Sequence, residues 1–454
     1  MPYATVNPAT GQTERTFPPH TPDEVEERLQ RAADTFAEYR LTSFAERARH
    51  LHNAADLFEG EAPEIARIVT TEMGKTFAAA RGEASKCALG LRWFAEHAEA
   101  LLADEPISSG ASRSYVRYQP IGPVLAIMPW NFPLWQVVRF IAPALMVGNV
   151  GLLKHASNVP QTALLLEDIF LRAGLPRGAF TNLFVESKDI AAIVEDPRIA
   201  AVTLTGSEKA GMSVASTAGH ALKKSVLELG GSDPFIVLES ADLDAAVRTA
   251  VTARVQNNGQ SCIAAKRFIV VEPIADEFLR RFTEAMDAVV VGDPFDPATE
   301  VGPIVSEAQR AELLGQIEEA RSQGAVVHGG GVLADQPGWY LKPAVLSGVT
   351  ADMPVALEEL FGPVAIVERV PDLDTALTVA NSTSFGLGSS VWTADEAEQQ
   401  RCIEEIEAGA VFVNAMVAST PELPFGGIKR SGFGRELSEL GLKEFCNAKT
   451  VFIT

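Results

Sequence analysis

Residues 121–153 have the sequence IGPVLAIMPWNFPLWQVVRFIAPALMVGNVGLL, which contains two short apolar runs. The runs are IGPVLAIM at 121–128 and NVGLL at 149–153, and each has the length of a strand that is buried on both faces. The segment between them is apolar at positions 137, 138, 140 and 141, as expected of a largely buried helix. The stretch therefore predicts a strand–helix–strand unit of a parallel sheet.

The same alternation extends in both directions from this unit. Apolar runs at 181–185, 199–204 and 224–229 are separated from one another and from 149–153 by helical segments near 160–173, 188–196 and 207–219. A second series of apolar runs follows Gly230 and Gly231, at 234–238, 267–271, 363–370 and 410–414. Alternation of this kind predicts an α/β fold with helices on a parallel sheet. The simplest organisation is two doubly wound units joined near residue 230.

The two ends of the chain are expected to have other structures. Thr21, Pro22 and Glu24 have the pattern of a helix N-terminus, and helical stretches follow to about Leu102. Residues 103–120 are polar, rich in turn residues and then β-prone, so they are expected to form an arm. Residues 447–454 end in TVFIT, a strand that this arm or a partner subunit could pair with.

Composition excludes several classes of protein. The chain has 454 residues, of which 47% are hydrophobic and 21% charged, as in a folded soluble enzyme. A formal net charge of −21 argues against binding to nucleic acid or anionic lipid. Four scattered cysteines indicate a reducing compartment, and no signal peptide or membrane helix is apparent. We expect a cytoplasmic protein with no membrane and no nucleic-acid partner.

A ligand site is expected where the strands of the first series end, because open parallel sheets bind ligands beyond their carboxyl edge. The segments there are PWNFP at 129–133, KHAS at 154–157, TGS at 205–207 and ELGG at 228–231. A lysine and a Gly-Ser turn before a helix suit a phosphate group. Taken singly, Lys154 is typical of a solvated lysine and Gly206-Ser207 of a turn with an N-cap. The patterns G-x-G-x-x-G and Walker A are both absent, so a dinucleotide site here would be atypical.

Cys262 is the candidate nucleophile. It ends the polar turn NNGQSC at 257–262, whereas the other three cysteines lie on predicted helices and default to structural roles. From the residues alone, a reactive and a structural role for Cys262 are about equally supported. Only His155 lies near the suspected loops, so a Cys–His hydrolase is poorly supported. Glu228 ends a buried strand, where a carboxylate is costly unless it is used in catalysis or paired with an arginine.

Six motifs in order resemble the NAD(P)-dependent aldehyde dehydrogenase superfamily. They are PWNFP at 129–133, TGS at 205–207, ELGG at 228–231, NNGQSC at 257–262, EELFGP at 358–363 and PFGGIKRSGFGRE at 424–436. Four longer stretches are similar to the bacterial succinate-semialdehyde dehydrogenases of that superfamily: MPWNFPLWQVVRF at 128–140, LLKHASNVP at 152–160, LELGGSDPFIV at 227–237 and NGQSCIAAKRFIV at 258–270. The resemblance covers essentially the whole chain.

The resemblance implies a division of the chain and an assembly. Residues 1–102 and 121–229 would form the NAD(P)-binding domain, and residues 230–430 the catalytic domain. Residues 103–120 and 440–454 would form the arm and strand through which the family makes dimers or dimers of dimers. A homodimer or homotetramer is therefore expected.

The resemblance also implies a mechanism in which Cys262 attacks an aldehyde as the thiolate. The side-chain amide of Asn131 and the backbone N–H of Cys262 would hold the oxyanion of the thiohemiacetal. Hydride transfer to the nicotinamide leaves a thioester, and Glu228 would activate the water that hydrolyses it. No metal takes part.

Cofactor and substrate positions follow from the same resemblance. The cofactor residues would be Trp130, Asn131, Lys154, His155, Ala156, Ser157, Gly206, Ser207, Leu229, Glu359 and Phe361. Strictly NAD-dependent relatives often have a glutamate at the position of Ser157, so NADP is expected to be preferred, with NAD as a possible alternative. Arg139 would bind a distal carboxylate of the substrate, with Gln256 and Ser261 nearby. Gln256 stands where many relatives have a second arginine, and Arg139 itself could instead belong to a surface ion pair.

Succinic semialdehyde is therefore the expected substrate. Other small aldehydes, such as glutarate semialdehyde or an aliphatic aldehyde, are the alternative within the family. A CoA-acylating enzyme is less well supported, because such relatives typically lack the base that Glu228 provides. A catalytically silent member with a binding or structural role is the remaining alternative.

Overall fold

The computed structural model describes residues 3–333 and 336–454, and its first large sheet has six strands. Their order is β17-β9-β8-β5-β6-β7, and all are parallel except β17. The strands are β5 (Pro123–Met128), β6 (Val150–His155), β7 (Phe180–Asn182), β8 (Ala201–Thr205), β9 (Lys224–Glu228) and β17 (Gly432–Phe433). The five parallel strands confirm the apolar runs of the first series.

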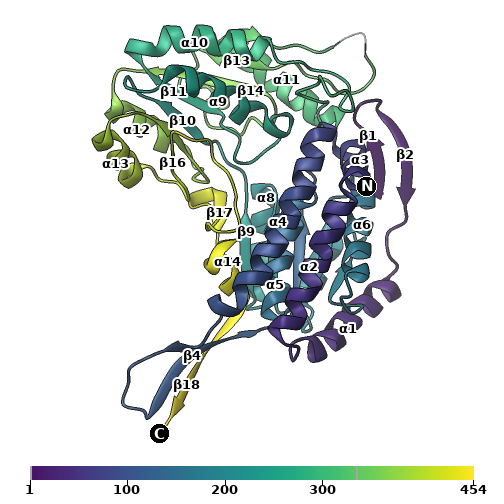
Figure 1. Cartoon of the computed structure of the whole chain (residues 1–454). Coiled ribbons are helices and arrows are strands. Elements are labelled where there is room, and N and C mark those ends of the chain that lie inside the picture. The colour runs from purple at the N-terminus through teal and green to yellow at the C-terminus, as the bar shows by residue number, and fades with distance from the viewer. Residues whose placement is uncertain (1–2, 334–335) are drawn as a thin grey trace.

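Helices cover this sheet and bury one large apolar core with it (Figure 1). They are α1 (Pro22–Tyr39), α2 (Phe44–Gly60), α3 (Ala62–Met73), α4 (Phe77–Leu101), α5 (Trp135–Val147), α6 (Pro160–Arg172), α7 (Ile190–Glu195) and α8 (Glu208–His220). Helix α1 begins as expected, because the Thr21 hydroxyl accepts from the Glu24 N–H and the Glu24 carboxylate accepts from the Thr21 N–H. Every residue of α5 is buried, as the sequence between the first two strands predicted.

The second sheet has seven strands in the order β12-β13-β14-β11-β10-β15-β16, and only β12 is antiparallel to its neighbour. The strands are β10 (Pro234–Val237), β11 (Arg267–Val271), β12 (Val326–Gly329), β13 (Ala344–Ser347), β14 (Val364–Val370), β15 (Ser390–Trp392) and β16 (Phe412–Val413). Its helices are α9 (Leu243–Val255), α10 (Glu272–Asp287), α11 (Glu307–Ser322), α12 (Leu373–Asn381) and α13 (Glu396–Glu405). This second α/β unit lies above the first in Figure 1.

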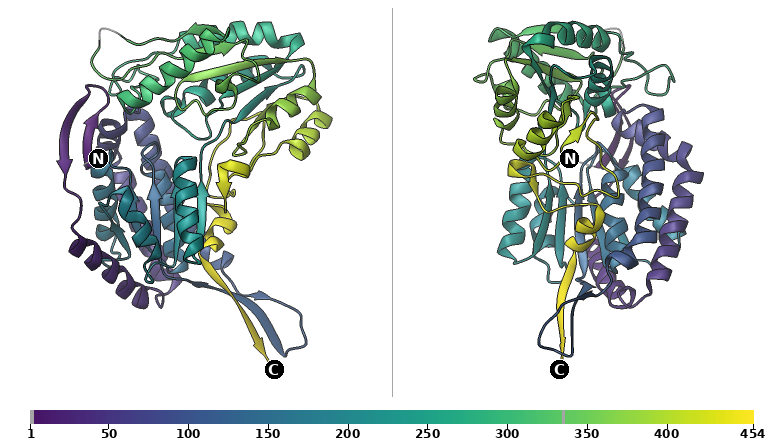
Figure 2. Two further views of the ribbon diagram at one scale, coloured as in Figure 1. Left: turned by 180° about the vertical axis from the view of Figure 1, so that it is seen from behind. Right: turned by 60° about the vertical axis from the view of Figure 1, so that its left-hand side comes forward.

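A β-arm extends from the body of the molecule, with the C-terminus near its tip (Figures 1 and 2). It consists of β3 (Glu105–Pro106), β4 (Arg113–Pro120) and β18 (Cys446–Ile453), which follows α14 (Ser438–Glu444). Strand β18 pairs antiparallel with β4 along its whole length, from Cys446 opposite Pro120 to Ile453 opposite Arg113. The C-terminal strand therefore pairs with the arm of its own chain.

A hairpin at the N-terminus was not predicted from the sequence. Strands β1 (Tyr3–Asn7) and β2 (Gln12–Phe17) pair antiparallel, and the Ala4 N–H donates to the Ser157 carbonyl at 3.0 Å. The hairpin thereby contacts the loop that follows β6. Across the described ranges, no helix combines the length and apolar character needed to cross a bilayer.

Candidate active site

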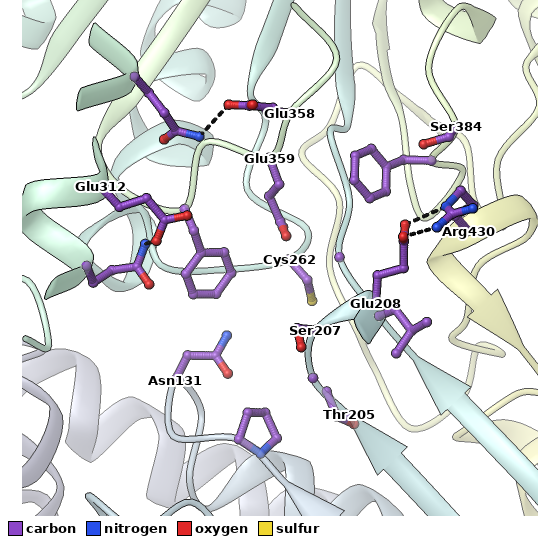
Figure 3. A pocket seen from close by; sticks show the side chains of 18 of the residues that line it. Asn131, Thr205, Ser207, Glu208, Cys262, Glu312, Glu358, Glu359, Ser384 and Arg430 are labelled. Atoms are coloured by element: carbon purple, nitrogen blue, oxygen red, sulfur yellow. Dashed lines mark hydrogen bonds and ion pairs between the residues drawn. The ribbon is translucent and has the colours of Figure 1, made fainter. Parts of the chain in front are cut away.

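A cavity of about 910 Å³ lies beyond the carboxyl ends of β5, β8 and β9. Helix α11 and the segment 357–361 line it as well, so both sheet units contribute to its wall. Figure 3 shows Cys262 at its centre, with Glu359 on one side and Asn131 on the other. The predicted site residues that line it are Trp130, Asn131, Gly206, Ser207, Leu229, Cys262, Glu359 and Phe361.

The turn that carries Cys262 owes its shape to three successive residues with positive φ. Asn257 and Asn258 have φ of 55° and 58°, and Gly259 has φ of 73°. Asparagine tolerates the left-handed region better than most residues. A Cβ at Gly259 would lie 2.3 Å from the carbonyl carbon of Gly362, so only glycine fits where the two loops touch. The NNG sequence therefore sets the path that brings Cys262 into the cavity.

The amide side chains of this turn fasten it to its surroundings. Asn257 Nδ2 donates to the carbonyl of Asn131 at 2.8 Å, and Asn258 Nδ2 donates to the carbonyls of Gly74 and Pro303. Gln260 Oε1 accepts from the Val305 N–H at 3.0 Å. The polar composition of the motif thus serves to hold the turn in place.

Asn131 is held with its amide directed toward the nucleophile turn. Its Oδ1 accepts from Gln136 Nε2 at 3.0 Å, and its Nδ2 donates to the carbonyl of Gln260 at 3.0 Å. Because Gln136 occupies the acceptor, the NH₂ group stays on the side of Cys262. Sequence reasoning missed Gln136, although it is the second residue of α5, the helix that follows PWNFP.

The thiol of Cys262 is protonated at neutral pH in this structure. Burial raises its pKa from 9.0 to about 12, while the positive charges of Arg139 and Lys266 lower it. Catalysis therefore requires a proton acceptor or a further stabilising charge when substrate binds. Among the described residues, no acceptor takes the backbone N–H of Cys262, which leaves it available to an oxyanion.

Glu228 lies at the end of β9, beneath Gly426, and does not line the cavity. Neither of its carboxylate oxygens has a hydrogen-bond partner among the described residues. Burial, reinforced by the neighbouring Glu436 carboxylate, raises its pKa well above the usual value. To act as a base, this carboxyl group must first ionise and turn toward the cavity, and no hydrogen bond from a described residue holds it in its present position.

Arg139 belongs to a buried ion pair. Its Nε contacts the Glu436 carboxylate, its NH2 group donates to Thr205 Oγ1 at 3.1 Å, and its guanidinium lies over the Phe425 ring. The structure does not place it among the cavity-lining residues. Its expected role in binding a substrate carboxylate remains a prediction, and Glu436 would compete for the same charge.

The remaining predicted substrate residues, Gln256 and Ser261, do not line the cavity either. Gln256 Nε2 donates to the carbonyl of Ala253, in the last turn of the preceding helix α9, at 3.4 Å. Ser261 is fully buried, and its hydroxyl has no partner among the described residues. The structure therefore brings neither side chain into the space in front of Cys262.

The Gly206-Ser207 turn forms the start of α8, as expected for a phosphate-binding turn. The Ser207 hydroxyl accepts from the Ala210 N–H, and the Gly206 N–H donates to the Glu228 carbonyl at 3.0 Å. Glu208, the first residue of α8, pairs with Arg430 across the cavity mouth (Figure 3). The positive end of the helix dipole faces the cavity at this turn.

Lys154, at the penultimate position of β6, has a half-buried ammonium group. No carboxylate pairs with it within the described ranges, and burial alone lowers its pKa. An unpaired cation suits an anionic ligand such as a phosphate, although Lys154 lies outside the lining of the cavity. Ser157, three residues later, brings no negative charge to this position.

His155 has a structural role, despite its place among the predicted cofactor residues. It is fully buried, and its Nδ1 accepts from the Ala156 N–H at 3.0 Å. The proton on Nε2 is then directed at the carbonyl of Pro133, 2.9 Å away. Burial lowers its pKa to about 4, so the neutral ring ties the end of β6 to the PWNFP loop.

Glu359 presents a carboxylate to the cavity and is held from behind. Its Oε1 accepts from the Gly231 N–H at 3.1 Å and lies 3.3 Å from Lys266 Nζ. A Cβ at Gly230 would lie 2.4 Å from its Oε2, so a larger residue there would displace the carboxylate. Phe361 and Trp130 form an edge-to-face pair with ring centroids 5.7 Å apart.

These features fit a dinucleotide. The cavity combines a helix N-terminus, a carboxylate for ribose hydroxyls and a polar pocket around a thiol. The described part of the chain contains no cluster of histidine, cysteine, aspartate and glutamate that could hold a metal ion.

The family model for the aldehyde dehydrogenase family matches residues 1–451. The chain belongs to this family. Relatives in Mycobacterium tuberculosis and Mycobacterium avium, named succinate-semialdehyde dehydrogenase [NADP(+)], are 60% and 59% identical over the whole of this chain and cover 100% and 97% of their own lengths.

Solved structures share the fold of this chain over nearly its whole length. The succinic semialdehyde dehydrogenase of Streptococcus pyogenes in complex with NADP⁺ has a TM-score of 0.97 at 38% identity, over 99% of both chains. That of Burkholderia pseudomallei has a TM-score of 0.96 at 34% identity, over 99% of this chain and 94% of the other.

Proposed function

We propose that the protein oxidises succinic semialdehyde to succinate with NADP as the hydride acceptor. The observation that carries the proposal is the position of Cys262, in one cavity with the amide of Asn131 and the carboxylate of Glu359. The names of relatives about 60% identical over the full length support the substrate and the cofactor. Membership of the family supports the general reaction, which is oxidation of a small aldehyde.

The residues of the chain account for the chemistry on the substrate. Cys262 passes its proton to a water molecule as its sulfur bonds to the aldehyde carbon, and the Asn131 amide and the Cys262 N–H stabilise the oxyanion. A nicotinamide held at its ribose by Glu359 would supply the hydride acceptor for that carbon, which then remains bonded to the Cys262 sulfur as a thioester. Glu228, once its carboxyl has ionised, turns from its place beside Gly426 and takes a proton from water, and the resulting hydroxide displaces the thiolate to give the carboxylate product.

The preference for NADP follows from two residues beside β6. A 2′-phosphate needs a positive charge and must meet no negative one. Lys154 supplies an ammonium without a carboxylate partner among the described residues, and Ser157 is an uncharged donor. Measurement of kcat/KM for both cofactors tests this proposal, which fails if NAD gives the larger value.

Three further assignments accompany the proposed function. Residues 1–102 and 121–229 form the NADP-binding domain and residues 230–430 the catalytic domain. Residues 103–120 and 440–454 join subunits in a homodimer or homotetramer. Exposed Phe452 and Ile453 on the projecting arm support a subunit contact there, because a solvent-facing strand rarely carries two such residues. Light scattering during gel filtration tests the assembly, and a monomer would contradict it.

A further inference from the structure

Lys266 is fully buried directly behind the active site, where charged side chains are rare. It lies four residues after Cys262 and immediately before β11. Its backbone is fixed on both sides, since its N–H donates to the Asp233 carbonyl at 3.1 Å and its carbonyl accepts from the Ile366 N–H at 2.8 Å. The base of the side chain is therefore held rigidly by the second sheet.

Three oxygen atoms surround the ammonium group of Lys266. Two are the carbonyls of Ser261 and Cys262, at 2.9 and 2.6 Å, and the third is Glu359 Oε1, at 3.3 Å. Two of the three N–H donors of the ammonium bond to the carbonyls, and the charge lies within ion-pair distance of Glu359. The lysine thus bonds at the same time to the nucleophile turn and to the carboxylate on the other side of the cavity.

The contacts of Glu359 show what this arrangement achieves. Lys266 and the Gly231 N–H both engage Oε1, whereas no described residue donates to Oε2. One oxygen is anchored and the other remains free at the cavity, where Glu359 is part of the lining. A carboxylate fixed in this way is pre-organised to accept a hydroxyl group of a ligand.

We propose that Lys266 is a positioning residue that couples cofactor binding to the nucleophile turn, by holding Glu359 ready for a ribose hydroxyl and fixing the carbonyl of Cys262. This inference rests on the proposed use of NADP. The charges at the site agree with it, because Lys266 lowers the pKa of Cys262 and Glu359 raises it.

A simpler role for Lys266 would be to neutralise Asp233, another buried acid nearby. Burial raises the pKa of Asp233 to about 7, and the positive charge of Lys266 lowers it. The two side chains nevertheless form no hydrogen bond or ion pair within the described ranges. The ammonium contacts the carbonyls of the nucleophile turn and Glu359, which favours the positioning role.

A double-mutant cycle with Lys266→Met and Glu359→Gln tests the coupling. The dissociation constant of NADP is measured by quenching of tryptophan fluorescence in the wild type, both single variants and the double variant. Loss of a hydrogen bond to a charged group predicts weakening by about tenfold or more for Lys266→Met. In the Glu359→Gln background the same substitution should weaken binding less than twofold, because the carboxylate through which the lysine acts is gone.

A second readout uses the protein without cofactor. Alkylation of Cys262 by iodoacetamide should be slower in Lys266→Met, because the cation that favours the thiolate is lost. The control is Lys223→Met, since Lys223 is also partly buried and donates to a backbone carbonyl, that of Asp196, but lies outside the cavity lining. It should change neither NADP affinity nor alkylation. Lys266→Gln serves in the same cycle if Lys266→Met does not fold, as judged by its melting temperature.

The possible outcomes separate this inference from the proposed function. If the wild type does not bind NADP, the proposed function and the inference both fail. If the wild type binds NADP and Lys266→Met binds it equally well, or if the two substitutions weaken binding independently, the coupling role is overturned and the proposed function stands.

Discussion

Replacement of Glu228 by glutamine should separate the two halves of the reaction. The substitution keeps the size of a side chain that is 2% exposed, and it removes only the capacity to accept a proton. Because neither carboxylate oxygen has a hydrogen bond to lose among the described residues, the fold should tolerate the amide. Hydride transfer does not require this group, whereas hydrolysis of the thioester does.

The expected result is a burst of NADPH followed by slow turnover. Rapid mixing with succinic semialdehyde and NADP should give a 340 nm burst close to one equivalent per active site. General-base catalysis typically contributes about 10²–10⁴-fold, so the following steady-state rate should fall by that factor. Loss of the burst together with turnover would show that Glu228 acts before hydride transfer, and an unchanged steady-state rate would refute its role as the base.

The same substitution should also change stability in a pH-dependent way. The pKa of Glu228 in the folded protein lies above the ordinary value of 4.5, so the protonated carboxyl favours folding at low pH. That contribution is lost as the pH rises toward the folded-state pKa, by about 1.4 kcal/mol for each unit between the two pKa values. Glu228→Gln should therefore melt higher than the wild type at pH 8, with a smaller difference at pH 5.

Glu72→Gln is a matched control for these measurements. Glu72 is also fully buried, and burial raises its pKa to about 7, but it accepts hydrogen bonds from Thr5 and Thr162 outside the cavity. Its replacement should lower the melting temperature and leave the ratio of burst to steady-state rate unchanged. A burst in this variant as well would mean that slow hydrolysis is a general consequence of lost stability.

Four other substitutions or conditions test separate parts of the site. Asn131→Ala should lower kcat by about 10²–10³-fold through loss of an oxyanion donor, and an effect below threefold in steady-state assays would exclude that role. Alkylation of Cys262 in the enzyme without cofactor should accelerate about tenfold per pH unit between pH 7 and 9. The reason is that its pKa is raised to about 12, and below that value the thiolate fraction grows about tenfold with each pH unit. A plateau near pH 8 would contradict the raised pKa. Ser157→Glu should shift the ratio of kcat/KM for NADP over NAD by at least tenfold toward NAD, and an unchanged ratio would place the 2′-phosphate elsewhere. Arg139→Met should raise the KM for succinic semialdehyde more than for butanal if the arginine binds the substrate carboxylate, whereas equal effects on both aldehydes would assign it to the ion pair with Glu436.

Local sequence patterns predicted most of the fold. Buried parallel strands are continuous apolar runs, so β5, β8 and β11 could be found from the sequence alone. The cap at Thr21 could also be predicted, because its partner Glu24 lies three residues away. The β1–β2 hairpin was missed because β2 is polar and largely exposed, and the contact of β1 with Ser157 joins distant parts of the chain.

Only some of the active-site residues and contacts could be predicted from the sequence. Cys262 and Asn131 lie in compact motifs, and the structure places both on the cavity. The burial of Arg139 followed from its apolar neighbours, but its partner Glu436 comes from the C-terminal segment, and no local pattern links the two. Lys266 lies only four residues after Cys262, yet only the three-dimensional structure brings Glu359 to its side chain.

The most direct test of the central claim is the absorbance at 340 nm of purified protein mixed with succinic semialdehyde and NADP. The account predicts steady reduction of NADP by the wild type, a lower kcat/KM with NAD, and no reduction by Cys262→Ala. Reduction that persists in Cys262→Ala would contradict the assignment of the nucleophile. Activity confined to uncharged aldehydes would contradict the proposed substrate.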